Sequence, residues 1–234
     1  VPREWEGARS EIEKNLDLLR ALVPDVAPWS PDDAPSLLNP LLETRSHQRE
    51  LSANGHSKPS AEADRAAAPG RSGPRMGISL GSPWPTKMWP LEENIRLART
   101  LTARGVEVVL LGDPAAVSLG LEIEKSVPSL LLKNLIGKTS IPEWIHEISS
   151  LDVLLSGDSA AVHVASDLRI PVVALFGPTI PEFGFAPWRK KSVVLQVKGL
   201  DCRPCDIHGP KVCPKGHHRC LKDIPNDRVS RFVE

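Results

Sequence analysis

The residues of this chain that could do chemistry on a small ligand gather around Asp158. This aspartate follows the apolar run 153–155 and Gly157, and it precedes a predicted helix over 159–168. A carboxylate at that place can cap the helix, and it can also accept hydrogen bonds from sugar hydroxyls. The free amides of the first helical turn favour anions and hydroxyl groups. Those amides belong to Ser159, Ala160 and Ala161.

Three further residues could join this site. His163 lies four residues after Ser159 on the predicted helix, so the two share one face. Lys87 lies in the loop after a predicted strand, and a cation beside free helix amides suits a diphosphate. Thr139 ends a glycine turn that leads into another helix. Each residue also has a plainer interpretation, respectively a satisfied core histidine, a solvated loop lysine and a turn residue or helix cap.

Alternating strands and helices position these residues. Apolar runs without polar alternation are typical of strands that are covered on both faces. The predicted strands cover 76–80, 106–111, 130–135, 153–155, 172–176 and 192–197, and the predicted helices cover 90–105, 115–125, 142–149, 159–168 and 226–233. This order predicts an α/β fold with an open, Rossmann-like parallel sheet and helices on both faces. Because the carboxyl ends of parallel strands share one edge, Lys87 can face Asp158 there.

Composition limits the classes of function. The chain has 234 residues, of which 41% are hydrophobic, enough for one α/β domain with surplus or for two small ones. Lys plus Arg equals Asp plus Glu at 29 each, so no overall charge favours a nucleic-acid partner. No apolar run has the length of a membrane-spanning helix, and no signal-peptide pattern opens the chain. We therefore expect a soluble, cytoplasmic protein.

The first 75 residues differ in character from the rest. Apolar residues recur at helical spacing over 11–22 and predict an amphipathic helix that needs a partner surface. The following stretch is rich in Pro, Ser, Ala, Asp and Arg, which is typical of a linker or disordered insertion. We therefore divide the chain into a helix over 1–26, a linker over 27–75, a ligand-binding domain over 76–200 and a Cys/His-rich tail with a final helix over 201–234.

The tail contains a second group of reactive side chains. Its cysteines follow the spacing C-x2-C-x7-C-x6-C, with three histidines interleaved. They are Cys202, Cys205, Cys213 and Cys220. In a reducing cytosol such clustering favours a structural zinc over disulfides. Because the second pair lacks the tight spacing of a zinc ribbon, free thiols and disulfides remain alternatives.

Five segments, in their order and spacing, resemble the donor-binding half of bacterial glycosyltransferase family nine, the ADP-heptose lipopolysaccharide heptosyltransferases. They are GSPWPTKMWP, LLGDP, NLIGKTS, SGDSAAVHVASDL and PVVALFGPT. The resemblance extends from about residue 76 to the C-terminus. It implies a GT-B architecture, in which two Rossmann-like domains face each other across a cleft. The C-terminal domain would hold the nucleotide-sugar, and the N-terminal domain the lipid acceptor and a catalytic carboxylate base.

The resemblance also implies roles for individual residues. Lys87 and Ser82 would contact the diphosphate, and Thr139 would line the nucleotide pocket. Asp158 would hold the sugar hydroxyls, while the amides of the helix that follows it would receive a phosphate. His163 would support the start of that helix. These groups would neutralise the departing diphosphate, where negative charge grows as the glycosidic bond breaks.

The implied reaction is transfer of a heptose, or a related sugar, from a nucleotide-sugar such as ADP-heptose to a lipopolysaccharide core acceptor. No catalytic metal is implied, and the enzyme would be cytoplasmic or peripheral at the inner face of the inner membrane. The helix over 11–22 looks like the family's bridging helix, so the catalytic domain is expected upstream of Val1 and this chain would bind a donor without turnover. Ala115 and Ala116 stand where family members often carry a ribose-binding glutamate. The alternative from another class is a non-catalytic nucleotide- or metal-binding module.

Overall fold

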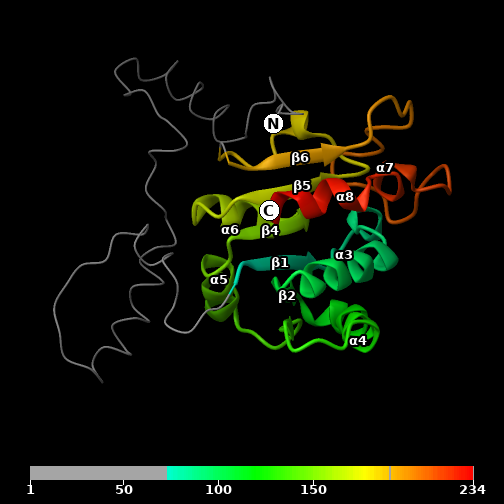
Figure 1. The fold of residues 1–234 in the computed structure, drawn as a ribbon. Coiled ribbons are helices and arrows are strands. Elements are labelled where there is room, and N and C mark those ends of the chain that lie inside the picture. Colours follow the sequence, from blue (N-terminus) through cyan, green and yellow to red (C-terminus); the bar gives the residue numbers. More distant parts are fainter. Residues whose placement is uncertain (1–72, 190, 234) are drawn as a thin grey trace, which may run out of the picture.

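The computed structural model describes residues 73–189 and 191–233, and the predicted helix over 11–22 lies outside these ranges. Six parallel strands form one sheet in the order β3-β2-β1-β4-β5-β6. Figure 1 labels β1, β2, β4, β5 and β6. The strands are β1 (Arg75–Leu80), β2 (Glu107–Gly112), β3 (Leu132–Asn134), β4 (Val153–Gly157), β5 (Val172–Phe176) and β6 (Val193–Gln196). The predicted open parallel sheet is confirmed.

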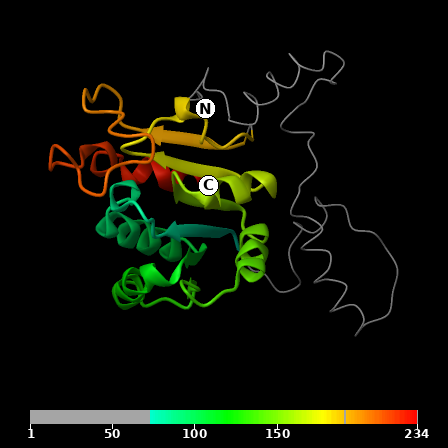
Figure 2. The same ribbon diagram turned by 180° about the vertical axis from the view of Figure 1, so that it is seen from behind.

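Helices cover both faces of the sheet (Figures 1 and 2). They are α3 (Leu91–Ala103), α4 (Val117–Ser126), α5 (Ile141–Ser149), α6 (Ala160–Asp167), α7 (Arg219–Lys222) and α8 (Asn226–Ser230). Apolar side chains of α3, α4, α7 and α8 pack on one face, and those of α5 and α6 pack on the other. Successive strand residues serve opposite faces: Val108 and Leu110 join the first core, and Val109 joins the second. This explains why the strands read as continuous apolar runs.

Several boundaries differ from those expected. Strand β1 begins at Arg75, the last residue of the predicted linker. Pro90 is the N-cap of α3 rather than its first residue. The predicted helix over 115–125 is divided into the 3₁₀ turn η2 (Pro114–Ala116) and α4. The reason is local, because the Asp113 carboxylate accepts a hydrogen bond from the Ala115 amide at 2.8 Å and fixes a tight turn first.

The Cys/His-rich tail packs onto the domain that precedes it. Helix α7, which the sequence analysis did not predict, contributes Cys220 and Leu221 to the core on the α3 face, and α8 contributes Val229. The predicted final helix over 226–233 is α8 followed by the 3₁₀ turn η4 (Arg231–Val233). In Figure 1 the tail loops lie on the side toward which the strand arrows point. Within the described ranges, none of the helices combines the length and apolar character needed to cross a membrane.

Candidate functional site

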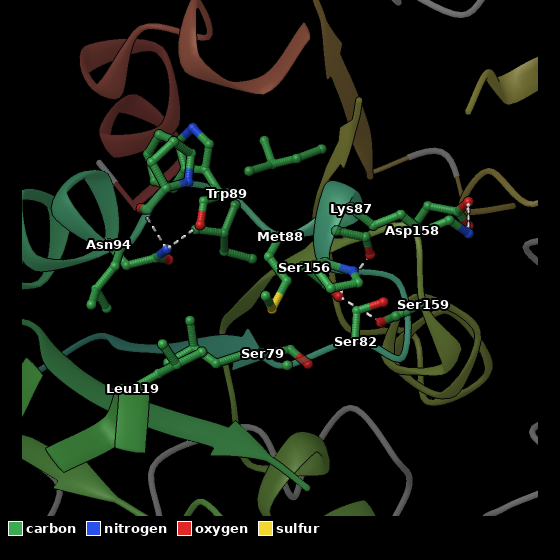
Figure 3. Close-up of a pocket in the computed structure, with 18 residues that line it drawn as sticks. Ser79, Ser82, Lys87, Met88, Trp89, Asn94, Leu119, Ser156, Asp158 and Ser159 are labelled. Atoms are coloured by element: carbon green, nitrogen blue, oxygen red, sulfur yellow. Dashed lines mark hydrogen bonds and ion pairs between the residues drawn. The ribbon is translucent and has the colours of Figure 1, made fainter. Parts of the chain in front are cut away.

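Two adjoining cavities lie at the carboxyl edge of the sheet. The first has a volume of about 190 Å³ and is lined by Lys87 and Asp158 among others, as Figure 3 shows. The second has a volume of about 350 Å³ and is lined by the loop after β3 and the start of α6. Both cavities share the segment Ser79–Ser82 and Ser159. Together they form one continuous site, built from the loops that were expected to meet at this edge.

A buried ion pair lines the first cavity. Lys87 Nζ donates to Asp158 Oδ2 at 2.7 Å, and the Thr179 hydroxyl donates to the same oxygen at 2.9 Å. The side chains of Lys87 and Asp158 are only 10% and 6% exposed. Lys87 therefore faces Asp158 as expected, and it is not a solvated loop lysine.

Asp158 is not the cap of α6, contrary to the plainer interpretation of the sequence. Ser159 stands at the N-cap position, in extended conformation, and Asp158 turns away from the helix toward Lys87. A charge-assisted bond to an ammonium group is stronger than a bond to a neutral amide, which explains this choice. Thr179 was missed as a site residue, although it follows β5 just as Asp158 follows β4.

Gly157 permits the close approach of the two loops. A Cβ atom at this position would lie 2.6 Å from the backbone oxygen of Lys87, which is closer than real Cβ contacts. Gly157 shares the lining of the first cavity with serine hydroxyls. Ser156 Oγ lies 2.9 Å from Ser159 Oγ, and Ser82 Oγ accepts a hydrogen bond from the Trp84 amide at 3.0 Å. Figure 3 shows these serines beside the ion pair. Next to them, the first amides of α6 have no partner within the helix.

Residues at the start of α5 line the second cavity. Thr139 lies there, and so do Ser140, Ile141 and Trp144, which were not selected from the sequence. Ser140 donates from its amide and its hydroxyl to the Glu143 carboxylate at 2.9 and 2.7 Å and so fixes the helix start. Trp144 packs partly on the core, whereas Ile141 is 74% exposed. An aromatic ring and an exposed aliphatic side chain thus give the second cavity an apolar part that lies outside the lining of the first.

The helix position of His163 does not bring it into either cavity. Its side chain is exposed, and Ala160 and Ala161 line the second cavity instead. Although His163 is exposed to solvent, neighbouring protein atoms partly desolvate its imidazole and lower the pKa of His163, and the Asp158 carboxylate acts in the opposite direction. A role of His163 in ligand contact is therefore without geometric support.

The four cysteines of the tail form no disulfide in this structure. Cys202 Sγ lies 3.9 Å from His217 Nε2, and Cys205 donates to the Cys202 carbonyl. Among the described residues, no three His, Cys, Asp or Glu side chains are arranged to hold a metal ion. The zinc hypothesis for Cys202, Cys205, Cys213 and Cys220 therefore stays a prediction without support from this geometry.

Comparison with known proteins gives a consistent result. Residues 32–212 match the model of glycosyltransferase family 9 (heptosyltransferase). Lipopolysaccharide heptosyltransferase 2 of Escherichia coli strain K12 is 31% identical over 161 residues, 67% of this chain and 44% of that protein. Lipooligosaccharide heptosyltransferase 2 of Haemophilus influenzae is 30% identical over 157 residues, 64% of this chain and 44% of that protein. The chain thus spans less than half the length of these relatives.

Solved structures show the same fold. The structure of E. coli ADP-heptose lipopolysaccharide heptosyltransferase II matches 74% of this chain and 48% of its own, with a TM-score of 0.59 and 28% identity. A family 9 glycosyltransferase from Veillonella parvula matches 96% of this chain and 58% of its own, with a TM-score of 0.64. Its 18% identity supports the fold alone.

Proposed function

Because the chain belongs to glycosyltransferase family 9, the heptosyltransferase family, we propose that it is the donor-binding part of a glycosyltransferase. The donor would be a nucleotide-sugar, ADP-heptose in the first place, since a relative of known structure is an ADP-heptose lipopolysaccharide heptosyltransferase. The acceptor would be the core saccharide of lipopolysaccharide.

The observation that carries this proposal is the pair of adjoining cavities, which share serine residues and differ in the rest of their lining. A nucleotide-sugar is a linear molecule with a flat base, a doubly charged centre and a hydroxyl-rich sugar. The second cavity offers the ring of Trp144, the shared lining offers the hydroxyls of Ser82 and Ser159, and the first cavity offers the ion pair. We assign the base, the diphosphate and the sugar to these three parts in that order.

The centre of the site suits a diphosphate. The first amides of α6 point toward an anion at the helix N-terminus, where the helix dipole adds to their attraction. An ammonium group has three donors, so Lys87 can keep its bond to Asp158 and still donate to a phosphate oxygen. These groups would stabilise the charge that develops on the departing diphosphate.

Asp158 would recognise the sugar. Lys87 and Thr179 use two acceptor positions on its Oδ2 atom, and a carboxylate offers about four such positions. The Oδ1 atom can accept hydrogen bonds from sugar hydroxyls. The ion pair thus offsets part of the hydration that the carboxylate loses on burial.

Trp144 and Ile141 would hold the nucleobase. Stacking of a base on an aromatic ring contributes about 1–3 kcal/mol to the binding free energy. The exposed side chain of Ile141 would become covered when the base binds. Contact with a flat apolar surface does not by itself select adenine over other bases. A comparison of diphosphates with different nucleobases therefore tests this part of the site independently.

We further propose that a facing domain supplies the catalytic carboxylate base and the lipid-linked saccharide acceptor, as the family resemblance implies. The enzyme would then act in the cytoplasm, at the inner face of the inner membrane. A structural zinc in the tail would be a local clip and takes no part in this assignment.

Isothermal titration calorimetry with ADP and with inorganic pyrophosphate tests the assignment. We expect the chain to bind both, and Lys87→Met to weaken both, since the diphosphate loses a cation. Trp144→Leu should weaken ADP roughly tenfold, about 1.4 kcal/mol, and leave pyrophosphate unchanged.

Two outcomes would contradict the proposal. Absence of ADP binding to the wild-type chain would favour the non-catalytic module, and equal loss of ADP and pyrophosphate in Trp144→Leu would place the base elsewhere. The exposed Arg231→Gln variant is the matched control, because it changes one charge far along the chain in an exposed pair with Asp227.

A further inference from the structure

The turn after β5 connects the Cys/His-rich tail with the buried ion pair. The guanidinium of Arg203 donates to the carbonyl oxygens of Gly177 and Thr179, the latter at 2.8 Å, and to that of Phe176 at 3.0 Å. The amide of Cys205 donates to the Pro178 carbonyl at 2.9 Å. Four consecutive carbonyl groups of this turn therefore accept hydrogen bonds from two residues of the tail.

Arg203 also anchors the turn to the neighbouring strand. Its Nη1 donates to the Val197 carbonyl at 2.6 Å, and its Nη2 lies 3.1 Å from the Gln196 side-chain oxygen. All five acceptors are neutral oxygens. An arginine is typically matched to carboxylates or phosphates, but its planar fork of donors can equally fix several carbonyls at once. Here that fork holds a turn in a defined shape.

This turn also holds the ion pair in place. Thr179 is fully buried, its backbone oxygen accepts from Arg203, and its hydroxyl donates to Asp158 Oδ2. Asp158 Oδ2 is the atom that Lys87 contacts. One continuous series of hydrogen bonds thus runs from Arg203 through Thr179 and Asp158 to Lys87.

The tail also braces the loop that carries Lys87. His218 Nε2 lies 2.7 Å from the Thr86 carbonyl, and the Thr86 hydroxyl donates to the Pro210 carbonyl. A Cβ atom at Gly209 would lie 3.4 Å from Lys87 Cε, so the tail backbone covers the lysine stem. Both partners of the ion pair are therefore supported from the tail.

We infer that Arg203 is a positioning residue of the donor site, which sets the orientation of Asp158 through Thr179, and that the tail supports the two loops that carry the ion pair. The inference rests on the proposed function for its ligand, and it gives the Cys/His-rich tail a task that needs no metal. Arg203 itself lines neither cavity. Its effect on binding must pass through the carboxylate of Asp158.

Calorimetry with ADP-heptose tests this series in a double-mutant design, because Asp158 is assigned to the sugar of the donor. We expect Arg203→Gln and Thr179→Val each to weaken ADP-heptose binding about tenfold, which is the usual effect of losing one charge-assisted hydrogen bond. Because both act through Asp158, neither should weaken ADP-heptose binding further when Asp158→Asn is already present. Guanidinium ions at millimolar concentration should restore binding to Arg203→Ala. Arg219→Gln, a change of an exposed arginine in the same tail, is the matched control.

The outcomes separate this inference from the proposed function. Wild-type affinity in both variants, or fully additive losses with Asp158→Asn, would overturn the role of Arg203 while the donor site stands. If the wild-type chain binds no ADP, the proposed function fails. Amide hydrogen exchange then tests the positioning role of Arg203 without a ligand. In Arg203→Gln and Thr179→Val, exchange should rise at residues 157–160, and an unchanged rate there would overturn the inference without any ligand.

Discussion

Lys87 Nζ and Asp158 Oδ2 lie 2.7 Å apart although 71 positions separate the two residues in the chain. Their loops follow β1 and β4, which are hydrogen-bonded neighbours in the sheet. Both side chains are largely removed from water, so each charge depends on the other to offset its lost hydration. The pair therefore links the stability of the fold to the electrostatics of the candidate site.

Removing one partner of this pair should be costly. Lys87→Met or Asp158→Asn leaves a buried group without its partner, and we expect each to lower the free energy of unfolding by about 3 kcal/mol. The double variant should lose less than the sum of the two. Urea denaturation measures the free energy of unfolding of the two single variants and the double variant. In the same double-mutant cycle, the exposed pair Arg231–Asp227, with side chains 69% and 64% exposed, should show a coupling energy below about 0.5 kcal/mol. Additive losses at Lys87 and Asp158 would contradict the interdependence of the buried pair.

Gly157→Ala should distort the junction between the loops. The added methyl would meet the Lys87 carbonyl at 2.6 Å, and backbone cannot move aside as a flexible side chain can. We expect a loss of about 1–3 kcal/mol in unfolding free energy together with weaker ADP binding. Gly199→Ala is the control, since it meets nothing within 4 Å and only its positive φ opposes the change, at about 1 kcal/mol. Wild-type ADP affinity in Gly157→Ala would show that the site tolerates the shift.

The tail thiols should differ in reactivity. Burial by itself would raise the pKa of Cys213, but backbone amides from Lys215 to His218 hydrogen-bond to its sulfur and lower it. Burial raises the pKa of Cys220 to about 11. Since the thiolate is the nucleophile, alkylation at about pH 7.5 should modify Cys213 first and Cys220 last.

Peptide mass spectrometry after a short exposure to iodoacetamide gives the order of modification. Modification of Cys220 before Cys213 would contradict the described environments. Protection of all four cysteines that a chelator removes would instead identify a bound metal, and so would decide the zinc hypothesis in the same experiment.

Glu147 should make stability depend on pH in the acid range. Burial alone would raise its pKa, but hydrogen bonds and charge from Lys133 and Arg75 lower it below the ordinary 4.5. A carboxyl with a depressed folded pKa stabilises the fold above its unfolded pKa, and this contribution is lost as the pH falls through the folded pKa. Glu147→Gln should therefore cost about 1 kcal/mol at pH 7 and nothing near pH ~3.

Urea denaturation at both pH values checks this convergence. The exposed Glu122→Gln variant serves as the control, because its change leaves the Arg75 and Lys133 contacts intact. A difference between wild type and Glu147→Gln that stayed constant with pH would contradict the ion-pair origin of the shift.

Sequence reasoning located the loops of the site better than the helix residues in it. Lys87 and Asp158 could be predicted to meet because each directly follows a parallel strand, and strand ends share one edge. The same argument could not decide whether His163 or Trp144 faces the cavity, because both lie on helices. Which side of a helix faces a cavity depends on how its apolar residues seat on the core, and in α6 that packing leaves His163 exposed.

The sequence by itself determined the α/β class, the order of strands and helices, and the edge at which ligand-binding residues gather. These follow from local patterns of apolar residues, glycines and helix termini. Only the tertiary structure decided the partners: Asp158 pairs with Lys87 instead of capping α6, and Arg203 folds back to hold a turn 26 positions earlier in the chain. Hydrogen bonds between distant segments depend on packing geometry, and no spacing along the chain encodes it.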